Sequence, residues 1–132
     1  MEMTFSVTKD ISTEDIAGLL CCAFEGGSNY WYCIDYDKSV KPPEIDPELK
    51  KGWGTFRHIS WPMSKGGALC VLDASDDEEE EYTLDLNAIK RGLDIMSKKY
   101  PRHWGDFINQ NDDAYTGDCF LQCCIFGEAI YG

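Results

Sequence analysis

The residues of this chain best suited to ligand chemistry lie between Gly52 and Gly67, a segment with two tryptophans, a phenylalanine, an arginine, a histidine and a lysine. Aromatic rings stack on bases, and Arg or Lys side chains pair with phosphates. This combination favours a nucleotide-type ligand, for which Arg57, Trp61 and Lys65 are the candidate contacts. The alternative, that these side chains anchor a long loop to the core, remains open for them and is favoured for Trp53.

A second group of candidates follows a predicted helix. Apolar residues recur with helical spacing from Ile16 to Phe24, after the N-cap residue Ser12. Gly26 stands where a helix C-cap favours glycine, so we expect a positive φ there. The candidate ligand contacts beside this helix end are Glu25, Asn29, Tyr30 and Trp31.

A third group lies near the C-terminal end of the sequence. Asp118, Gln122 and Glu128 are polar residues in or after a predicted last helix and are expected to form a polar wall. Asp112 and Asp113 with Asp118 would suit Mg²⁺, but Asn-Asp-Asp is also ordinary turn and cap sequence. We therefore predict no metal site.

Motifs for catalysis are missing from the sequence. It has no Gly-rich nucleotide fingerprint, no Walker loop, no nucleophile elbow and no zinc-protease motif. The seven cysteines include no C-x-x-C pair, and we expect them to be reduced thiols, mostly in the core. We therefore predict a protein that is not an enzyme, with no catalytic residues and no cofactor.

The charge is strongly acidic, with 24 Asp and Glu against 12 Lys and Arg and a formal net charge of −12. Such a chain repels nucleic acid, so direct nucleic-acid binding is not expected. The acidic run Asp76 to Glu81 is interpreted as a solvated hairpin tip, although it could also mimic nucleic acid towards a basic partner. The sequence shows neither a signal peptide nor a membrane span, so we expect a cytoplasmic protein.

The pattern of elements predicts a single α+β domain over residues 1–132. We expect a small, mainly antiparallel sheet of about four strands, with three to four helices packed chiefly on one face. The predicted strands are residues 3–8, 30–37, 67–73 and 82–86, the third being central. The predicted helices are residues 13–25, 86–100 and 103–110 and a last one capped by Thr116 or Asp118, whereas 41–64 is expected to be irregular.

Several short motifs resemble a family of small phage and prophage proteins. The front motif runs from Ala23 to Trp31 and includes Glu25-Gly26-Gly27 and Asn29-Tyr30-Trp31. The middle is similar in Ile59-Ser60 and Gly66-Gly67-Ala68-Leu69. The end is similar in Asp118, Leu121-Gln122 and Phe126-Gly127-Glu128. The resemblance implies a phage-encoded accessory protein in an infected bacterial cell and carries over no catalytic residue.

Two functions are compatible with that origin. The first is an anti-defence protein, a sponge that sequesters a nucleotide-type immune signal, with the phosphates facing Arg57 and Lys65. The second is an acidic protein–protein inhibitor, similar to an anti-CRISPR protein, that blocks a host defence protein. A structural phage protein is a third reading, and a homo-oligomer is left open.

Overall fold

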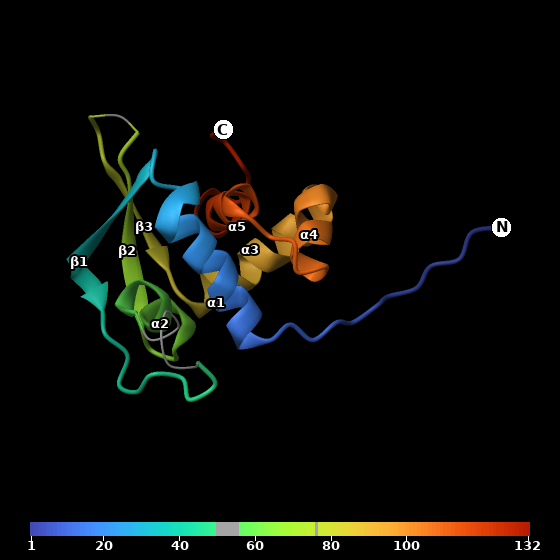
Figure 1. Cartoon of the computed structure of the whole chain (residues 1–132), viewed down its shortest axis with the longest axis horizontal. Coiled ribbons are helices and arrows are strands. Elements are labelled where there is room, and N and C mark those ends of the chain that lie inside the picture. Colours follow the sequence, from blue (N-terminus) through green and yellow to red (C-terminus); the bar gives the residue numbers. More distant parts are fainter. Residues whose placement is uncertain (50–55, 76) are drawn as a thin grey trace.

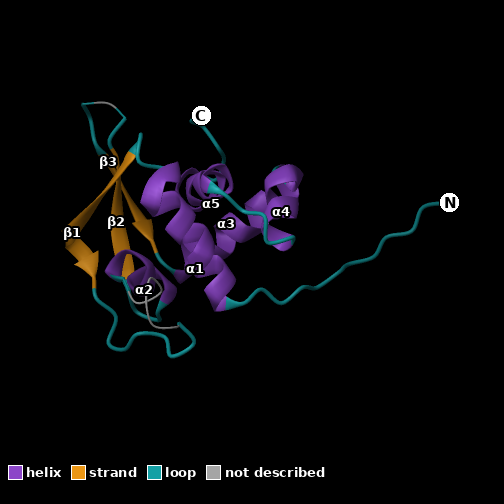
Figure 2. Cartoon of the chain, in the orientation of Figure 1, coloured by secondary structure: helices purple, strands orange, loops and turns teal. Residues whose placement is uncertain are grey.

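The computed structural model describes residues 1–49, 56–75 and 77–132, and these form an α+β fold. A sheet lies on one side of the molecule, and the helices pack beside it (Figures 1 and 2). The α-helices are α1 (Thr13–Cys22), α2 (Arg57–Met63), α3 (Leu86–Lys99), α4 (Pro101–Ile108) and α5 (Ala114–Phe126). A π-helical turn, η1 (Ala23–Gly27), extends α1, and the strands are β1 (Tyr32–Val40), β2 (Ala68–Asp73) and β3 (Glu80–Leu84).

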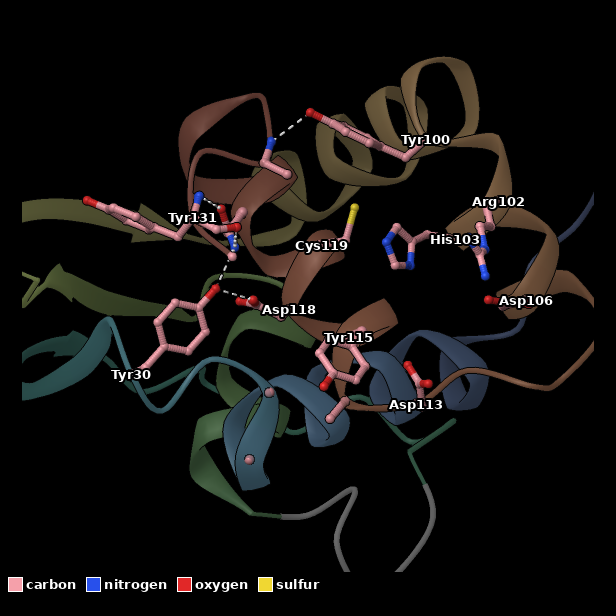
Figure 3. A pocket seen from close by; sticks show the side chains of 16 residues that line it. Tyr30, Tyr100, Arg102, His103, Asp106, Asp113, Tyr115, Asp118, Cys119 and Tyr131 are labelled. Carbon is pink, nitrogen blue, oxygen red and sulfur yellow. Dashed lines mark hydrogen bonds between the residues drawn. The ribbon is translucent and has the colours of Figure 1, made fainter.

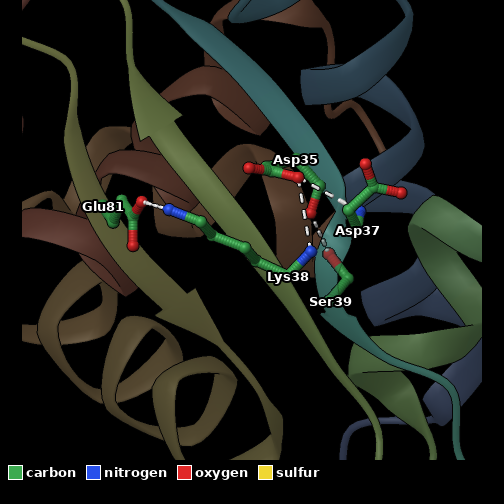
Figure 4. Close-up of polar contacts among 5 residues, drawn as sticks. All are labelled: Asp35, Asp37, Lys38, Ser39 and Glu81. Carbon is green, nitrogen blue, oxygen red and sulfur yellow. Dashed lines mark hydrogen bonds and ion pairs between the residues drawn. The ribbon is translucent and has the colours of Figure 1, made fainter.

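The sheet is antiparallel in the order β1-β2-β3, so β2 is central, as the sequence predicts. Val71 lies opposite Ile34 on one side and Tyr82 on the other. It is fully buried, as expected for a β-branched residue under the helices. The pairing of β1 becomes irregular after Asp35. There the Asp35 carboxylate accepts hydrogen bonds from the backbone N–H groups of Asp37 and Lys38 at 3.1 and 3.3 Å (Figure 4).

Helix α5 is the centre of the fold, because it is buried continuously from Thr116 to Ile125. Asp113 caps its first turn by accepting a hydrogen bond from Thr116 N at 3.0 Å. Gly127 ends it in the left-handed conformation, with φ 77°. At Gly117 a Cβ atom would lie 2.6 Å from the backbone nitrogen of Ala23, so glycine lets α5 approach the end of α1 closely.

Several predictions about the elements are wrong in detail. Residues 3–8 alternate like a strand but pair with no strand in the part of the chain that the structure describes, so the sheet there has three strands rather than four. The segment 41–64 is not irregular throughout, because it contains α2. The described helices number five, one more than predicted, and α5 is capped by Asp113 rather than Thr116 or Asp118. Asp76 lies outside the described residues, and Glu80 and Glu81 belong to β3 rather than to the hairpin tip.

The expected left-handed glycine at the end of the first helix is also wrong. Gly26 has φ 170°, which is extended backbone. The close approach occurs one residue later. A Cβ atom on Gly27 would fall on the carbonyl oxygen of Ala114 and within 3.0 Å of its carbonyl carbon. Glycine at position 27 therefore lets the end of η1 touch the start of α5.

The structure shows the state of the seven cysteines and the character of the helices. All seven cysteines lie in described residues and are free thiols. Cys70, Cys119, Cys123 and Cys124 are buried, whereas Cys33 is exposed and Cys21 and Cys22 are intermediate. Among the helices of the described residues, none has the length and apolar character needed to cross a bilayer.

Candidate functional site

A cavity of about 830 Å³ lies between the η1–β1 connection, α4, the first half of α5 and the C-terminal segment (Figure 3). Four tyrosines contribute to its walls: Tyr30, Tyr100, Tyr115 and Tyr131. Figure 3 shows Tyr30, Asp118 and Tyr131 at one end, and Arg102, His103 and Asp106 at the other. The first end is called the carboxylate end below, and the second the α4 end.

The carboxylate end is organised around Asp118, which α5 holds with 8% of its surface exposed. One carboxylate oxygen, Oδ1, accepts hydrogen bonds from Ser28 Oγ and Trp31 Nε1, both at 2.8 Å. The other, Oδ2, accepts the phenol O–H of Tyr30 at 2.5 Å. Three donors from residues 28–31 therefore satisfy the hydrogen bonding of the Asp118 carboxylate, as the burial of a carboxylate requires.

Tyr30 is held as a neutral phenol that donates its O–H to Asp118. Burial raises its pKa to about 12, and the hydrogen bond to Asp118 and the negative charge of that carboxylate act in the same direction. The residue is 54% exposed, so part of it remains available to a ligand. Tyr30 is therefore both part of the Asp118 network and an open aromatic surface.

Gln122, one turn after Asp118, fastens the C-terminal segment over the cavity. Its Oε1 accepts hydrogen bonds from the backbone N–H groups of Ile130 and Tyr131 at 2.8 and 2.9 Å. Its Nε2 donates to the carbonyl oxygen of Tyr131 at 3.3 Å and to Tyr30 Oη at 3.4 Å. Because the amide is 1% exposed, this clamp is a fixed part of the wall.

The α4 end offers a cation and an unsatisfied ring nitrogen. Arg102 is exposed in the first turn of α4 and lines the cavity. His103 Nδ1 is buried and has no hydrogen-bond partner among the described residues. Asp106 and Asp113 line the same end, so it holds two carboxylates as well as the cation. Because this nitrogen has almost no accessible surface, a ligand in the cavity meets Arg102 and the exposed part of the His103 ring rather than Nδ1.

Cys119 lies between the two ends. It lines the cavity with 5% of its surface exposed, and Figure 3 shows its thiol on the side where His103 lies. The hydrogen bond from Cys123 lowers the pKa of Cys119, and the same bond raises the pKa of Cys123. Among the described residues, no group of three or more His, Cys, Asp or Glu side chains is placed to hold a metal ion.

The structure brings only some of the predicted site residues together. Tyr30, Asp118 and Gln122 line the cavity. Trp31 lies behind them, 1% exposed, and supports the site through its bond to Asp118 and its packing against the ring of Tyr131. Glu128 is exposed in the C-terminal segment and does not line the cavity. The carboxylate end thus contains three of the expected contacts.

The predicted cations lie elsewhere, on α2 and the turn that follows it. The Arg57 guanidinium sits 4.1 Å above the ring of Tyr36, and Trp61 meets the same ring edge-on at 6.2 Å. Glu25 points to this side, with Oε1 3.4 Å from His58 Nε2. Lys65 is exposed beyond α2, Asn29 lines a shallow hollow beside β1, and Trp53 lies outside the described residues. The expected phosphate contacts are therefore not beside Asp118.

Sequence reasoning missed the α4 side of the site. Tyr100, Arg102 and His103 form a short stretch of aromatic and basic residues around Pro101, which begins α4. That composition is the same signal that singled out the 52–67 segment, and it could have been read in the same way. The contribution of Tyr131 has no signal in the sequence, because it depends on the Gln122 clamp.

Comparisons with protein-family models, with curated proteins and with solved structures gave no match to this chain.

Proposed function

We propose that this chain is a phage-encoded anti-defence protein that sequesters a nucleotide-type host signal in the cavity between α4 and α5. The phage assignment rests on the resemblance of the sequence motifs. The observation that carries the binding proposal is the union, in one cavity, of tyrosine walls with Arg102 and the ring of His103.

The size and walls of the cavity suit such a ligand. Its volume of about 830 Å³ falls within the roughly 300–1,000 Å³ that is usual for small-molecule sites. Tyr30 and Tyr115 are exposed rings that offer flat faces to a base. Stacking of a base on an aromatic ring contributes about 1–3 kcal/mol and tolerates different bases.

The charged residues that line the cavity favour one orientation of the ligand. Arg102 and His103 are the basic residues that line the cavity, so the phosphate faces the α4 end and meets them. Asp106 and Asp113 beside them accept hydrogen bonds, which favours a ligand with hydroxyl or amine groups next to its phosphate. A ribose phosphate carries both kinds of group. The base then lies towards Tyr30 and Gln122.

A screen of melting temperature against cyclic and linear mono- and dinucleotides tests this proposal. A ligand at about 100 times its Kd stabilises the folded state by about 2.7 kcal/mol. For a chain of this size that corresponds to a rise of roughly 10 °C. The absence of any shift across the panel, with the protein folded, would contradict the proposal.

The second candidate, an acidic inhibitor of a basic defence protein, is favoured by the outer face of the sheet. Asp35 and Glu81 lie on that face, and Glu81 forms an ion pair with Lys38 (Figure 4). Glu79 extends the acidic surface towards the hairpin and accepts a hydrogen bond from the Cys33 thiol at 3.6 Å. Replacing Asp77, Glu78 and Glu79, which precede β3, by Ser separates the candidates: it weakens salt-sensitive inhibition by a nucleic-acid mimic and leaves nucleotide binding intact.

A further inference from the structure

Residues 1–10 form an extended arm with apolar side chains that the other described residues do not cover. Every residue of the arm is exposed. Met3, Phe5 and Val7 are 80%, 80% and 81% exposed, although they alternate with Thr4, Ser6 and Thr8 as in a half-buried strand. This is the sequence-predicted fourth strand, and it is present without a partner.

The sheet has an edge that matches this arm. β1 pairs only with β2 among the described residues, so alternate backbone groups of β1 face away from the sheet. A hollow of about 310 Å³ runs along it, lined by Tyr32, Ile34 and Tyr36 together with Asn29 and Cys33. Tyr32, Ile34 and Tyr36 are only partly buried, which leaves apolar surface for alternate side chains of an added strand.

The available edge is short. After Asp35 the backbone N–H groups of Asp37 and Lys38 are taken up by the Asp35 carboxylate, as Figure 4 shows. An added strand therefore has about the stretch from Tyr32 to Tyr36 to pair with, five residues. The alternating part of the arm, residues 3–8, has a matching length. Of the residues in 3–8 and 32–36, only Asp35 is charged. A contact between these two stretches therefore avoids much of the repulsion expected between two chains of net charge −12.

The arm does not lie near its own β1. It leaves the start of α1 on the side of the molecule opposite the sheet and runs away from the body (Figure 1). We propose that two copies of this chain form a dimer by arm exchange, in which residues 3–8 of each copy add as a fourth strand to the β1 edge of the other. Met3, Phe5 and Val7 then cover Tyr32, Ile34 and Tyr36. This proposal is independent of the nucleotide proposal.

Sedimentation of the full chain over a range of concentrations tests the exchange, with Phe5→Asp as the disrupting variant and Ser6→Asp as its matched control. The two variants add the same charge, but their side chains lie on opposite faces of the arm. At about 0.5 M salt, which screens Asp35, we expect a concentration-dependent dimer whose Kd rises at least tenfold for Phe5→Asp and less than threefold for Ser6→Asp. Added salt should leave the dimer intact or strengthen it, because its contacts are apolar.

Hydrogen exchange of the backbone amides identifies the occupant of the edge. Arm exchange predicts that amides in 3–8 and 32–36 become protected together as dimer forms, and that Phe5→Asp removes both protections. A monomer at every concentration would overturn the proposal, whether its arm is unprotected or protected by folding back on its own β1. A dimer that Phe5→Asp leaves unchanged would overturn it as well.

Discussion

Replacing Asp118 by Ala should be among the most destabilising single changes in this protein. The substitution removes the acceptor of two donors that water cannot reach, because Ser28 is 0% and Trp31 1% exposed. Each buried donor left without a partner costs about 1–3 kcal/mol. Tyr30 is half exposed and can donate to water instead, so its lost bond adds little. The expected loss in the free energy of unfolding is therefore about 2–6 kcal/mol.

The isosteric change Asp118→Asn separates the hydrogen bonds from the charge. The amide oxygen can still accept from Ser28 and Trp31, while the amide N–H groups face Tyr30, whose oxygen can accept. We expect this variant to lose about half as much stability as the alanine variant. Glu128→Ala is the control, because Glu128 is exposed and outside the cavity, and its effect should stay within about 0.5 kcal/mol.

Urea unfolding followed by far-ultraviolet circular dichroism measures these differences. With a slope of about 1–3 kcal/mol per molar urea, the midpoint for Asp118→Ala should fall by roughly 2 M. A loss below about 1 kcal/mol for the alanine variant would refute the reasoning. It would show that the two buried donors find other partners, and that Asp118 does not organise this end of the cavity.

Two further predictions concern close packing and alkaline pH. Gly27→Ala should lower the free energy of unfolding by about 1–3 kcal/mol, because the added Cβ meets the backbone of Ala114. Gly26→Ala should change it little, since no described atom lies within 4 Å of a Cβ there. Equal urea midpoints for the two variants would contradict this prediction. The pKa is raised to about 12 at Tyr30, Tyr32 and Tyr82. The folded chain therefore keeps the phenol protons that the unfolded chain releases near pH 10. The free energy of unfolding is highest below pH 10 and falls as pH rises towards 12. Tyrosinate absorbance and urea midpoints measured together check this, and a midpoint independent of pH over that window would show it to be wrong.

The fold was largely predictable where local pattern and packing agree. The central strand β2 and the helix α3 were both predicted from the sequence, because burial enforces their apolar patterns. The arm at residues 3–8 shows the limit. Its alternation predicts a strand, but strand formation also needs a partner edge, which periodicity does not locate.

The site was less predictable than the fold. Tyr30, Asp118 and Gln122 were identified because polar residues stand out in a helix and beside a glycine stop. The prediction that Arg57 lies beside them was wrong, because Arg57 packs over Tyr36 instead. Residue types alone do not show where a segment distant in the sequence packs in the fold. The tertiary contacts instead bring Arg102 to Asp118's cavity.

The most direct test of the proposed function is the Kd of the strongest nucleotide from the screen, measured by calorimetry for the wild type, Arg102→Ala and Arg57→Ala. Both variants remove one exposed arginine, but only Arg102 lines the cavity. Losing a charge-assisted hydrogen bond costs about 1.5–3 kcal/mol, so Arg102→Ala should weaken binding roughly 10- to 100-fold. Arg57→Ala should leave the Kd within about twofold. Weakening by Arg57→Ala with an unchanged Arg102→Ala variant would place the ligand beside α2 and contradict the account.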